Sequence, residues 1–338
     1  NMNRKYFLSS LFTTGVSIKA LAASISGWDP SVRTPPGLKS GDVVGITSPA
    51  GHITAEELLP AIKQIETWGL KVRLGNTIGK RDFSFGGTDA ERVADFQQML
   101  DDPAVKAIMC ARGGYGSIRI IDQLNFSKFL IKPKWIIGFS DITVMHCHIG
   151  SNYKVATIHS KMCNSFPEDW SKAEPVQRDT ITSIKDALTG VKMKYNALPH
   201  ERNRNGITEG ILTGGNLKTI ETLAGSKSDI KTAGKILFVE DTGEYLYSID
   251  RMFWSLKRSG KLSQLKALII GGFKIKPDDP GEEFGRTLYE IVWEKVKAYN
   301  YPICFDFPVG HQINNYALKC GVLHRLSVTD NGVALLEI

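Results

Sequence analysis

Ser140 is the residue best suited to chemistry by its type and its position. It lies where a buried strand is predicted to turn into a helix. The run 135–137 is short and apolar, as in a covered parallel strand. Gly138 allows a tight turn, and Asp141 follows where a helix start favours a carboxylate. A serine on such a corner presents its hydroxyl to a cleft beside backbone N–H groups, which suits a nucleophile.

A serine hydroxyl needs a base to accept its proton and a third group to orient that base. Among the seven histidines, His311 is favoured because it lies in a loop that leaves a short predicted strand. Glu240 ends the apolar run 236–239 and is the candidate orienting acid. His52 and His159 lie near predicted strand ends and stay open as bases. A single histidine in a loop is more often a solvated surface residue, and a single carboxylate at a strand end is more often a cap. His311 and Glu240 therefore support a catalytic site only when taken together.

The first half of the chain alternates predicted strands with predicted helices. Repeated strand–helix units need right-handed crossovers and a parallel sheet covered on both faces. Loops at the carboxyl ends of such strands build the site, so segments 48–51 and 112–116 should converge on Ser140. The predicted strands span 42–48, 70–74, 105–110, 135–139 and 155–158, with helices at 54–68, 90–100, 116–124 and after Ser140.

The pattern changes after residue 163. Segment 164–205 is polar, carries Trp170 and holds one predicted helix, so it is interpreted as a linker. Shorter strands and helices then indicate a separate α+β domain. The predicted organisation is a nucleophile-bearing α/β domain at 36–163, the linker, and a C-terminal domain at 206–338 with the acid and the histidine. Further predicted elements are helices at 176–188, 249–258 and 282–298 and strands at 210–213, 235–240 and 267–270.

Composition is that of a soluble globular protein, with 338 residues, 42% hydrophobic and 23% charged, enough for two domains. The net charge is +7, and subtracting Arg4, Lys5 and Lys19 of the predicted leader leaves +4, spread along the chain. No nucleic-acid partner is expected from so mild an excess. The five cysteines show no metal-ligand spacing, and neither a metal nor a cofactor is predicted.

Residues 1–24 resemble an export signal. Arg4 and Lys5 form a charged start, 6–18 is moderately apolar, and 20–23 offers small residues for cleavage. The charged pair is similar to a twin-arginine signal with one arginine replaced by lysine. A periplasmic location is therefore expected, and the alternative is an attached N-terminal helix on a cytoplasmic protein. No stable membrane insertion is expected once the leader is removed, because no later stretch is long and apolar enough to span a bilayer.

Six short motifs resemble those of the LD-carboxypeptidase family of serine peptidases, which includes murein tetrapeptide carboxypeptidases and microcin C immunity proteins. The resemblance runs in family order from residue 38 almost to the C-terminus. The motifs are Gly-Ile-Thr-Ser-Pro-Ala-Gly at 45–51, Ala-Arg-Gly-Gly-Tyr-Gly at 111–116, Gly-Phe-Ser-Asp at 138–141, Gly-Gly-Asn-Leu at 214–217, Val-Glu-Asp at 239–241 and Gly-His at 310–311.

The resemblance implies an α/β fold, with an N-terminal flavodoxin-like parallel-sheet domain and a C-terminal α+β domain of the swivelling β/β/α kind. It implies Ser140 as nucleophile, His311 as general base and then acid, and Glu240 as the group that holds the histidine. Gly114 and Asp141 would donate backbone N–H groups to the oxyanion. It also implies a homodimer.

The expected reaction is cleavage of an L,D-peptide bond that releases terminal D-alanine from a murein tetrapeptide, a small peptide substrate. Residues expected to bind substrate are Arg112, for the free carboxylate, with Gly113, Trp170 and Asn216. The chain departs from the family at 159–162, where His-Ser-Lys-Met stands in place of an expected His-Gly-Pro. A microcin C-type peptide–nucleotide hydrolase and a noncatalytic periplasmic binding protein stay open. Trp170 would stack on the nucleotide in the first case, or simply pack the linker against its own domain.

Overall fold

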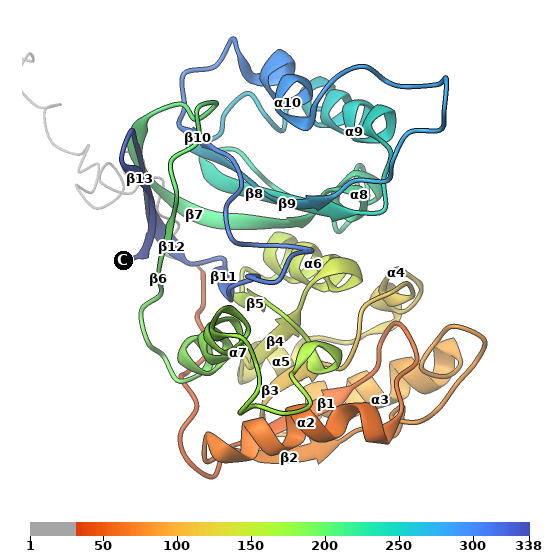
Figure 1. The fold of residues 1–338 in the computed structure, drawn as a ribbon. Helices are drawn as coiled ribbons and strands as arrows, with labels where there is room; N and C mark the ends of the chain where they lie inside the picture. The colour runs from red at the N-terminus through yellow and green to blue at the C-terminus, as the bar shows by residue number, and fades with distance from the viewer. Residues whose placement is uncertain (1–31) are drawn as a thin grey trace, which may run out of the picture.

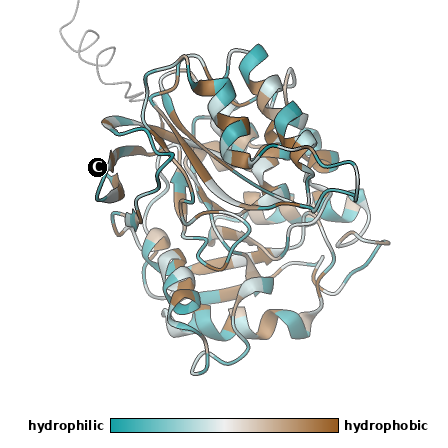
Figure 2. Ribbon diagram, turned by 45° about the horizontal axis from the view of Figure 1, so that its top comes forward, coloured by the Kyte–Doolittle hydropathy of each residue, from teal (hydrophilic) through white to brown (hydrophobic). Residues whose placement is uncertain are grey.

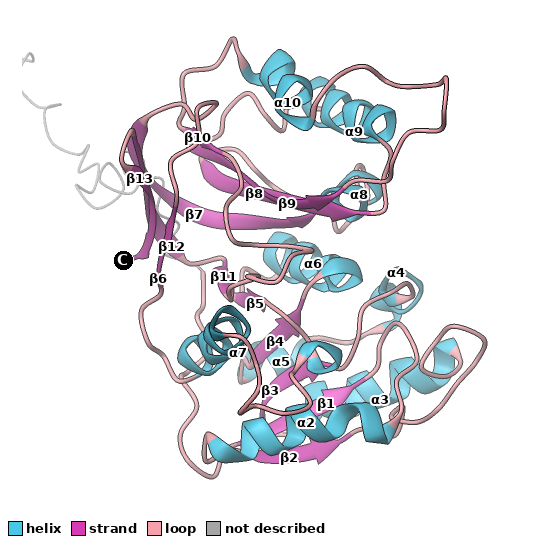
Figure 3. Ribbon diagram, viewed as in Figure 1, coloured by secondary structure: helices cyan, strands magenta, loops and turns pink. Residues whose placement is uncertain are grey.

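The computed structural model describes residues 32–338, so the predicted export signal at 1–24 lies outside the described residues. Two β-sheets are stacked with helices between and around them, as Figures 1 and 3 show. The sequence-predicted alternation of strands and helices in the first half is confirmed.

The first sheet has six strands in the order β11-β5-β4-β3-β1-β2. Its five N-terminal strands are parallel and follow the order 2-1-3-4-5, which is the flavodoxin arrangement expected from the resemblance. The elements of this half are β1 (Val43–Thr47), α2 (Ala55–Thr67), β2 (Lys71–Leu74), α3 (Asp89–Asp101), β3 (Val105–Cys110), α4 (Ser117–Ile120), η1 (Ile121–Gln123), α5 (Ser127–Ile131), β4 (Trp135–Gly138), η2 (Ser140–Ile142), α6 (Thr143–Asn152), β5 (Thr157–His159), η3 (Cys163–Ser165) and α7 (Pro175–Leu188).

The second sheet has seven strands in the order β10-β9-β8-β7-β12-β13-β6. The strands β7 to β10 pair in parallel, and the remaining neighbours pair antiparallel. Its elements are β6 (Lys194–Ala197), β7 (Gly206–Asn216), α8 (Leu217–Thr222), β8 (Lys235–Thr242), α9 (Leu246–Arg258), β9 (Ala267–Lys274), α10 (Leu288–Val296), β10 (Ile303–Cys304), β11 (Leu318–Cys320), β12 (Leu323–Thr329) and β13 (Gly332–Glu337).

Apolar side chains join the two halves into a continuous interior. One cluster holds residues of α3, α5 and α6 together with residues of α8, α9 and α10, and a second unites α2 and α7 with the inner face of the second sheet. In α9 the buried residues recur at helical spacing, as predicted, with Ile249, Met252, Phe253 and Leu256 turned inward. Figure 2 shows the same pattern as brown interior strands and helices with teal outer faces.

Two segments cross between the halves. The predicted linker 164–205 contributes α7 and also β6, which forms the edge of the second sheet by pairing with β13. In the opposite direction, β11 from the C-terminal half pairs antiparallel with β5 and completes the first sheet. The halves are therefore joined by strand pairing as well as by side-chain packing.

Some element limits differ from the predictions. The helix predicted at 282–298 begins only at Leu288, because Thr287 and Glu290 form a capping box and Gly285 has a φ of +72°. The helix predicted at 116–124 is a short α4 followed by the 3₁₀ turn η1. Within residues 32–338, no helix is long and apolar enough to cross a membrane, and all five cysteines are buried with free thiols.

Candidate active site

Ser140 follows β4 on a corner with unusual backbone geometry. Its φ is +61°, which is rare for a residue with a side chain and is typical of a nucleophile held on a sharp strand-to-helix turn. His146 of α6 fixes this turn, since its Nε2–H donates to the Gly138 carbonyl over 2.8 Å while Nδ1 contacts the Thr157 hydroxyl over 2.9 Å. The strained conformation is thus supported by a buried polar contact from the next helix.

The predicted convergence of strand-end loops on Ser140 is observed. A methyl group placed on Gly113 would lie 3.3 Å from Ser140 Cβ and 3.6 Å from Ser140 Oγ, so the glycine loop lies directly against the serine. The Gly51 N–H donates to the Gly113 carbonyl over 2.9 Å, which ties the loop after β1 to the loop after β3. Gly114 has a φ of +100°, a conformation that favours glycine.

Arg92 of α3 forms hydrogen bonds with both of these loops, a role that the sequence did not reveal. Its fully buried guanidinium donates to the carbonyls of Pro49 over 2.5 Å and Gly116 over 3.0 Å. The buried Asp141 carboxylate accepts the Ser117 N–H over 2.8 Å, which links the serine turn to the same glycine loop. Burial raises the pKa of Asp141, against the opposing effect of the Ser117 hydrogen bonds.

The second half supplies the acid and the histidine. His311 Nδ1 lies 2.5 Å from Glu240 Oε2, and the Glu240 side chain is fully buried. A methyl group on Gly310 would lie 2.4 Å from Glu240 Cβ, so a glycine, here with a φ of +107°, is required for this approach. The His311 ring also packs on Phe139, the residue before Ser140, with ring centroids 4.9 Å apart. The structure therefore pairs Glu240 with His311 and places the His311 ring on Phe139, the neighbour of Ser140 in the chain, while the catalytic roles of the three residues stay a prediction.

Asn216 takes part in the contact between the halves. Its backbone N–H donates to Thr143 Oγ1 over 3.0 Å, and its side-chain amide donates to Asp241 Oδ1 over 2.9 Å. The side-chain oxygen caps α8 at the Thr219 N–H. Burial raises the pKa of Asp241 to about 6, reinforced by the adjacent Glu240 carboxylate and opposed by its hydrogen bonds. Substrate binding by Asn216 stays a prediction.

The other residues expected to bind substrate occupy different settings. Arg112 is exposed, with Nη1 donating to the His52 carbonyl over 3.2 Å. Trp170 is partly buried and packs against the second core cluster, which agrees with the packing alternative considered for it. Of the alternative bases, His52 contacts the Lys80 carbonyl over 2.6 Å. His159 is fully buried between Phe139 and Phe238, and burial holds its pKa well below the usual range.

Two cavities open beside these residues. One encloses about 720 Å³ on the glycine-loop side and is lined by Gly51, Arg112, Gly114 and Tyr115 among others. The second encloses about 430 Å³ and is lined by a different set of residues that includes His311, Lys161 and Lys274. Each is large enough for part of a small peptide.

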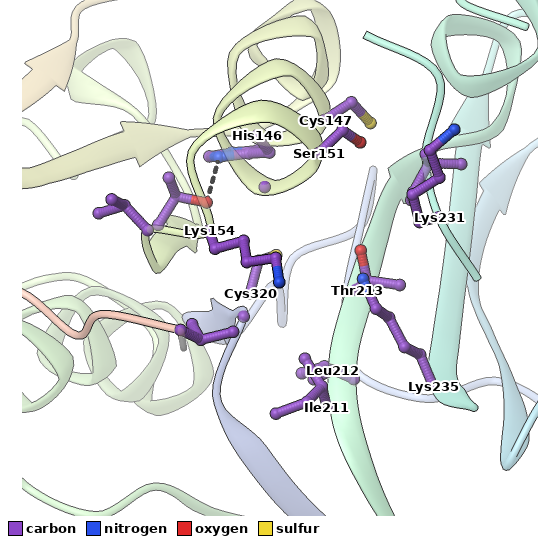
Figure 4. A pocket seen from close by; sticks show the side chains of 16 residues that line it. His146, Cys147, Ser151, Lys154, Ile211, Leu212, Thr213, Lys231, Lys235 and Cys320 are labelled. Atoms are coloured by element: carbon purple, nitrogen blue, oxygen red, sulfur yellow. Dashed lines mark hydrogen bonds between the residues drawn. The ribbon is translucent and has the colours of Figure 1, made fainter. Parts of the chain in front are cut away.

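A third cavity of about 230 Å³ lies behind α6, between β11 and β7. Figure 4 shows the lysines 154, 231 and 235 among the residues that line it, together with Leu212 and Cys320. None of Ser140, Glu240 and His311 lines this cavity, so it is separate from the chemistry. Across residues 32–338, no group of three or more His, Cys, Asp or Glu side chains could hold a metal ion.

Comparison with known proteins identifies this arrangement. Residues 44–160 match the model of the LD-carboxypeptidase N-terminal domain, and residues 209–326 match that of the C-terminal domain. The chain belongs to the LD-carboxypeptidase family. This membership, expected from the sequence motifs, is confirmed and places the protein among the peptidases, which are hydrolases.

Relatives of this family member include a probable and a named murein peptidase. It is 32% identical to a probable murein peptide carboxypeptidase of Bacillus subtilis, over 90% of this chain and 94% of the relative. It is 29% identical to a murein tetrapeptide carboxypeptidase of Pseudomonas aeruginosa, over 82% of this chain and 91% of the relative. The microcin C7 self-immunity protein MccF of Escherichia coli is 25% identical over 89% of this chain and 94% of that protein.

Solved structures of related proteins have the same fold. A muramoyltetrapeptide carboxypeptidase from Oxalobacter formigenes superposes with a TM-score of 0.77 at 25% identity, covering 88% of this chain and 99% of that one. MccF in complex with aspartyl sulfamoyl adenosine gives a TM-score of 0.78 at 23% identity, covering 90% and 98%. The latter likeness shows the fold alone, and together they confirm the predicted two-domain fold.

Proposed function

We propose that this LD-carboxypeptidase family member is a serine carboxypeptidase that hydrolyses an L,D-peptide bond and releases terminal D-alanine from murein tetrapeptides. The observation that carries the proposal is the 2.5 Å contact between His311 and the buried Glu240, packed against the residue before the strained Ser140. The murein peptidases among the relatives support the choice of substrate.

The chemistry follows from which atom each residue offers. Ser140 Oγ attacks the scissile carbonyl carbon while His311 Nε2 takes the hydroxyl proton. Glu240 accepts Nδ1–H, which fixes the tautomer and stabilises the imidazolium. The N–H groups of Gly114 and Asp141 are the proposed donors to the oxyanion, and one such donor is worth about 10²–10³ in turnover.

Collapse of the tetrahedral species breaks the C–N bond. His311 then gives its proton to the departing amine, and D-alanine is released. The rest of the peptide stays bound to Ser140 as an ester. Water, deprotonated by His311, attacks that ester, and the peptide leaves as its new C-terminal carboxylate while Ser140 recovers its proton. A periplasmic location, where murein peptides are accessible, and a homodimer remain part of the proposal as predictions.

The test is incubation of the protein with purified murein tetrapeptide, followed by mass spectrometry. Loss of one alanine is expected from the wild type, together with covalent labelling by a fluorophosphonate probe. Ser140→Ala should abolish both, whereas Ser263→Ala, a surface serine of the second half, should change neither. A wild-type protein that is neither labelled nor able to shorten the peptide would contradict the proposal and favour a noncatalytic binding protein.

The likeness to MccF favours a second candidate, hydrolysis of a peptide–nucleotide conjugate. An aminoacyl sulfamoyl adenosine offered in parallel should yield free amino acid if this activity is present. The packing of Trp170 against the core leaves less of its ring for stacking on a base, so the murein substrate is preferred.

A further inference from the structure

The direction in which the substrate lies follows from the proposed reaction, on which this inference rests. A general acid must be within about 3 Å of the leaving nitrogen, so the departing residue lies beside the His311 ring. Nδ1 of that ring is occupied by Glu240, which leaves Nε2 for the nitrogen. In a terminal residue the carboxylate is separated from this nitrogen by a single carbon. A group that recognises the free C-terminus must therefore lie close to His311.

The cavity on the His311 side has the chemistry for an anion. Its lining includes Lys161, Lys274, Gln177, Thr180 and His311 itself. None of the ten lining residues, all within the described part of the chain, carries a carboxylate. Two ammonium groups with amide and hydroxyl donors suit a carboxylate ligand.

Arg112 lies elsewhere. The cavity that it lines also contains Gly51 and Gly114, and His311 does not line that cavity. The glycine loop flanks Ser140 from the side of the proposed oxyanion donor, so Arg112 is placed to meet the part of the peptide that stays on the enzyme. Binding of the terminal carboxylate by Arg112 stays a prediction, and the cavity that Lys161 shares with His311 offers the alternative tested below.

Lys161 is held at the site with its charge uncompensated by a direct partner. Its Nζ lies 5.5 Å from the centre of the Phe139 ring, the same ring that packs on His311. Burial lowers the pKa of Lys161, and the charge of the nearby Glu240 acts in the opposite direction. Within residues 32–338, neither Lys161 nor Lys274 forms a hydrogen bond or an ion pair through its ammonium group. A partly desolvated cation of this kind gains when a substrate anion arrives.

We propose that Lys161, with Lys274 beside it, binds the terminal carboxylate of the departing residue and so restricts cleavage to free C-termini. Lys161 stands in the His-Ser-Lys-Met segment where the sequence departs from the expected family pattern. The feature is therefore a specificity determinant carried by this chain's own residues.

The experiment compares murein tetrapeptide with the same peptide ending in D-alaninamide. A charged hydrogen bond is worth about 10- to 100-fold in binding, so the wild type should prefer the free acid by about that factor in kcat/KM. Lys161→Met should lower kcat/KM for the acid by about 10- to 100-fold, mainly through KM, and leave the amide within about threefold. Lys161→Arg should keep most of the preference. Lys172→Met, an exposed lysine outside the cavity, is the matched control.

The outcomes separate this inference from the proposed function. A wild type that cleaves both peptides equally, or a Lys161→Met variant that keeps the wild-type preference, overturns the role of Lys161 and leaves the hydrolase standing. Loss of the preference in Arg112→Met, but not in Lys161→Met, would return the carboxylate to Arg112. Cleavage of neither peptide by the wild type refutes the proposed function instead. The rate of fluorophosphonate labelling shows whether each variant keeps an intact Ser140 site.

Discussion

The two carboxylate oxygens of Glu240 have different surroundings. Oε2 contacts His311, whereas Oε1 is buried without a hydrogen-bond partner among the described residues. A buried carboxylate with an open acceptor is costly in the resting state, and it stabilises a positive charge that forms on the neighbouring ring. The energetic gain is therefore expected when His311 is protonated during the reaction.

Glu240→Gln should leave the fold intact and lower kcat by about 10³- to 10⁴-fold, because a neutral amide neither fixes the tautomer nor stabilises the imidazolium. Steady-state kinetics on murein tetrapeptide and the rate of fluorophosphonate labelling measure the loss. Glu244→Gln is the matched control, since Glu244 contacts Ser248 rather than the histidine. Wild-type turnover in Glu240→Gln would remove this residue from the mechanism.

Local sequence was informative for Ser140, because strand, glycine, serine and acidic residue lie within a few positions of one another and together indicate a strand-to-helix corner. Glu240 and His311 are 71 residues apart, and their pairing depends on two strand ends and a loop meeting in space. Only the resemblance of several distant motifs joined them. Lys161 and Arg92 gave no local signal, because a lysine after a strand and an arginine in a helix are ordinary surface residues until tertiary packing buries them.

At the scale of elements, the loops that follow β1 and β3 are hydrogen-bonded to one side chain of α3. The buried Arg92 donates to carbonyls of two loops and forms an ion pair with the partly exposed Asp89. Its planar guanidinium reaches separate acceptors at fixed angles, which lysine cannot do. The glycine loop beside Ser140 should therefore depend on this one side chain for its position.

Arg92→Met should reduce the free energy of unfolding by about 2–4 kcal/mol, because buried loop carbonyls lose their donors. In the protein that remains folded, kcat should also fall, and Arg92→Lys should recover only part of it. Urea unfolding and peptide turnover provide the two measurements. Arg119→Met is the control, since Arg119 pairs with the same Asp89 from an exposed position and should cost at most about 1 kcal/mol. A folded Arg92→Met variant with normal kcat would contradict the role in positioning.

Most strands and helices could be predicted from hydrophobic period and turn residues, as for β1 and α9. The strands β6 and β11 were not placed from the sequence, because each gains its strand geometry from a partner in another part of the chain. The late start of α10 was missed because the capping box formed by Thr287 and Glu290, which fixes the first turn, was not taken into account.

At the scale of the whole molecule, acid should weaken the fold through its buried histidines, of which His146 and His324 are two. Burial lowers the pKa of His146 and of His324 to about 4. In the unfolded chain a histidine titrates near about 6.5, so the unfolded state binds more protons between these values. Stability is therefore full above about pH 6.5 and is lost as the pH falls towards 4, by up to about 3 kcal/mol for each ring. The raised pKa of Asp241, about 6, acts in the opposite sense because the folded state then holds the extra proton.

His324→Asn should flatten this pH dependence. The asparagine amide can replace Nδ1–H in its 2.9 Å contact with the Val322 carbonyl without acquiring a charge. Urea unfolding at pH 4.5, 5.5 and 7 should show a smaller loss on acidification than in the wild type. His200→Asn serves as control, because that ring is partly exposed and stacks on Tyr289. An unchanged slope in His324→Asn would contradict the assignment.

The exchange of β11 into the first sheet has a consequence for the order in which the protein is made. While the ribosome extends the chain, β5 has no neighbour on its outer side until residues 318–320 have been synthesised. An unpaired edge is a template for pairing with another chain. A nascent protein released before that point would hold a nearly complete first sheet in which the edge of β5 is unpaired. Premature truncation should therefore yield aggregates rather than a free N-terminal domain.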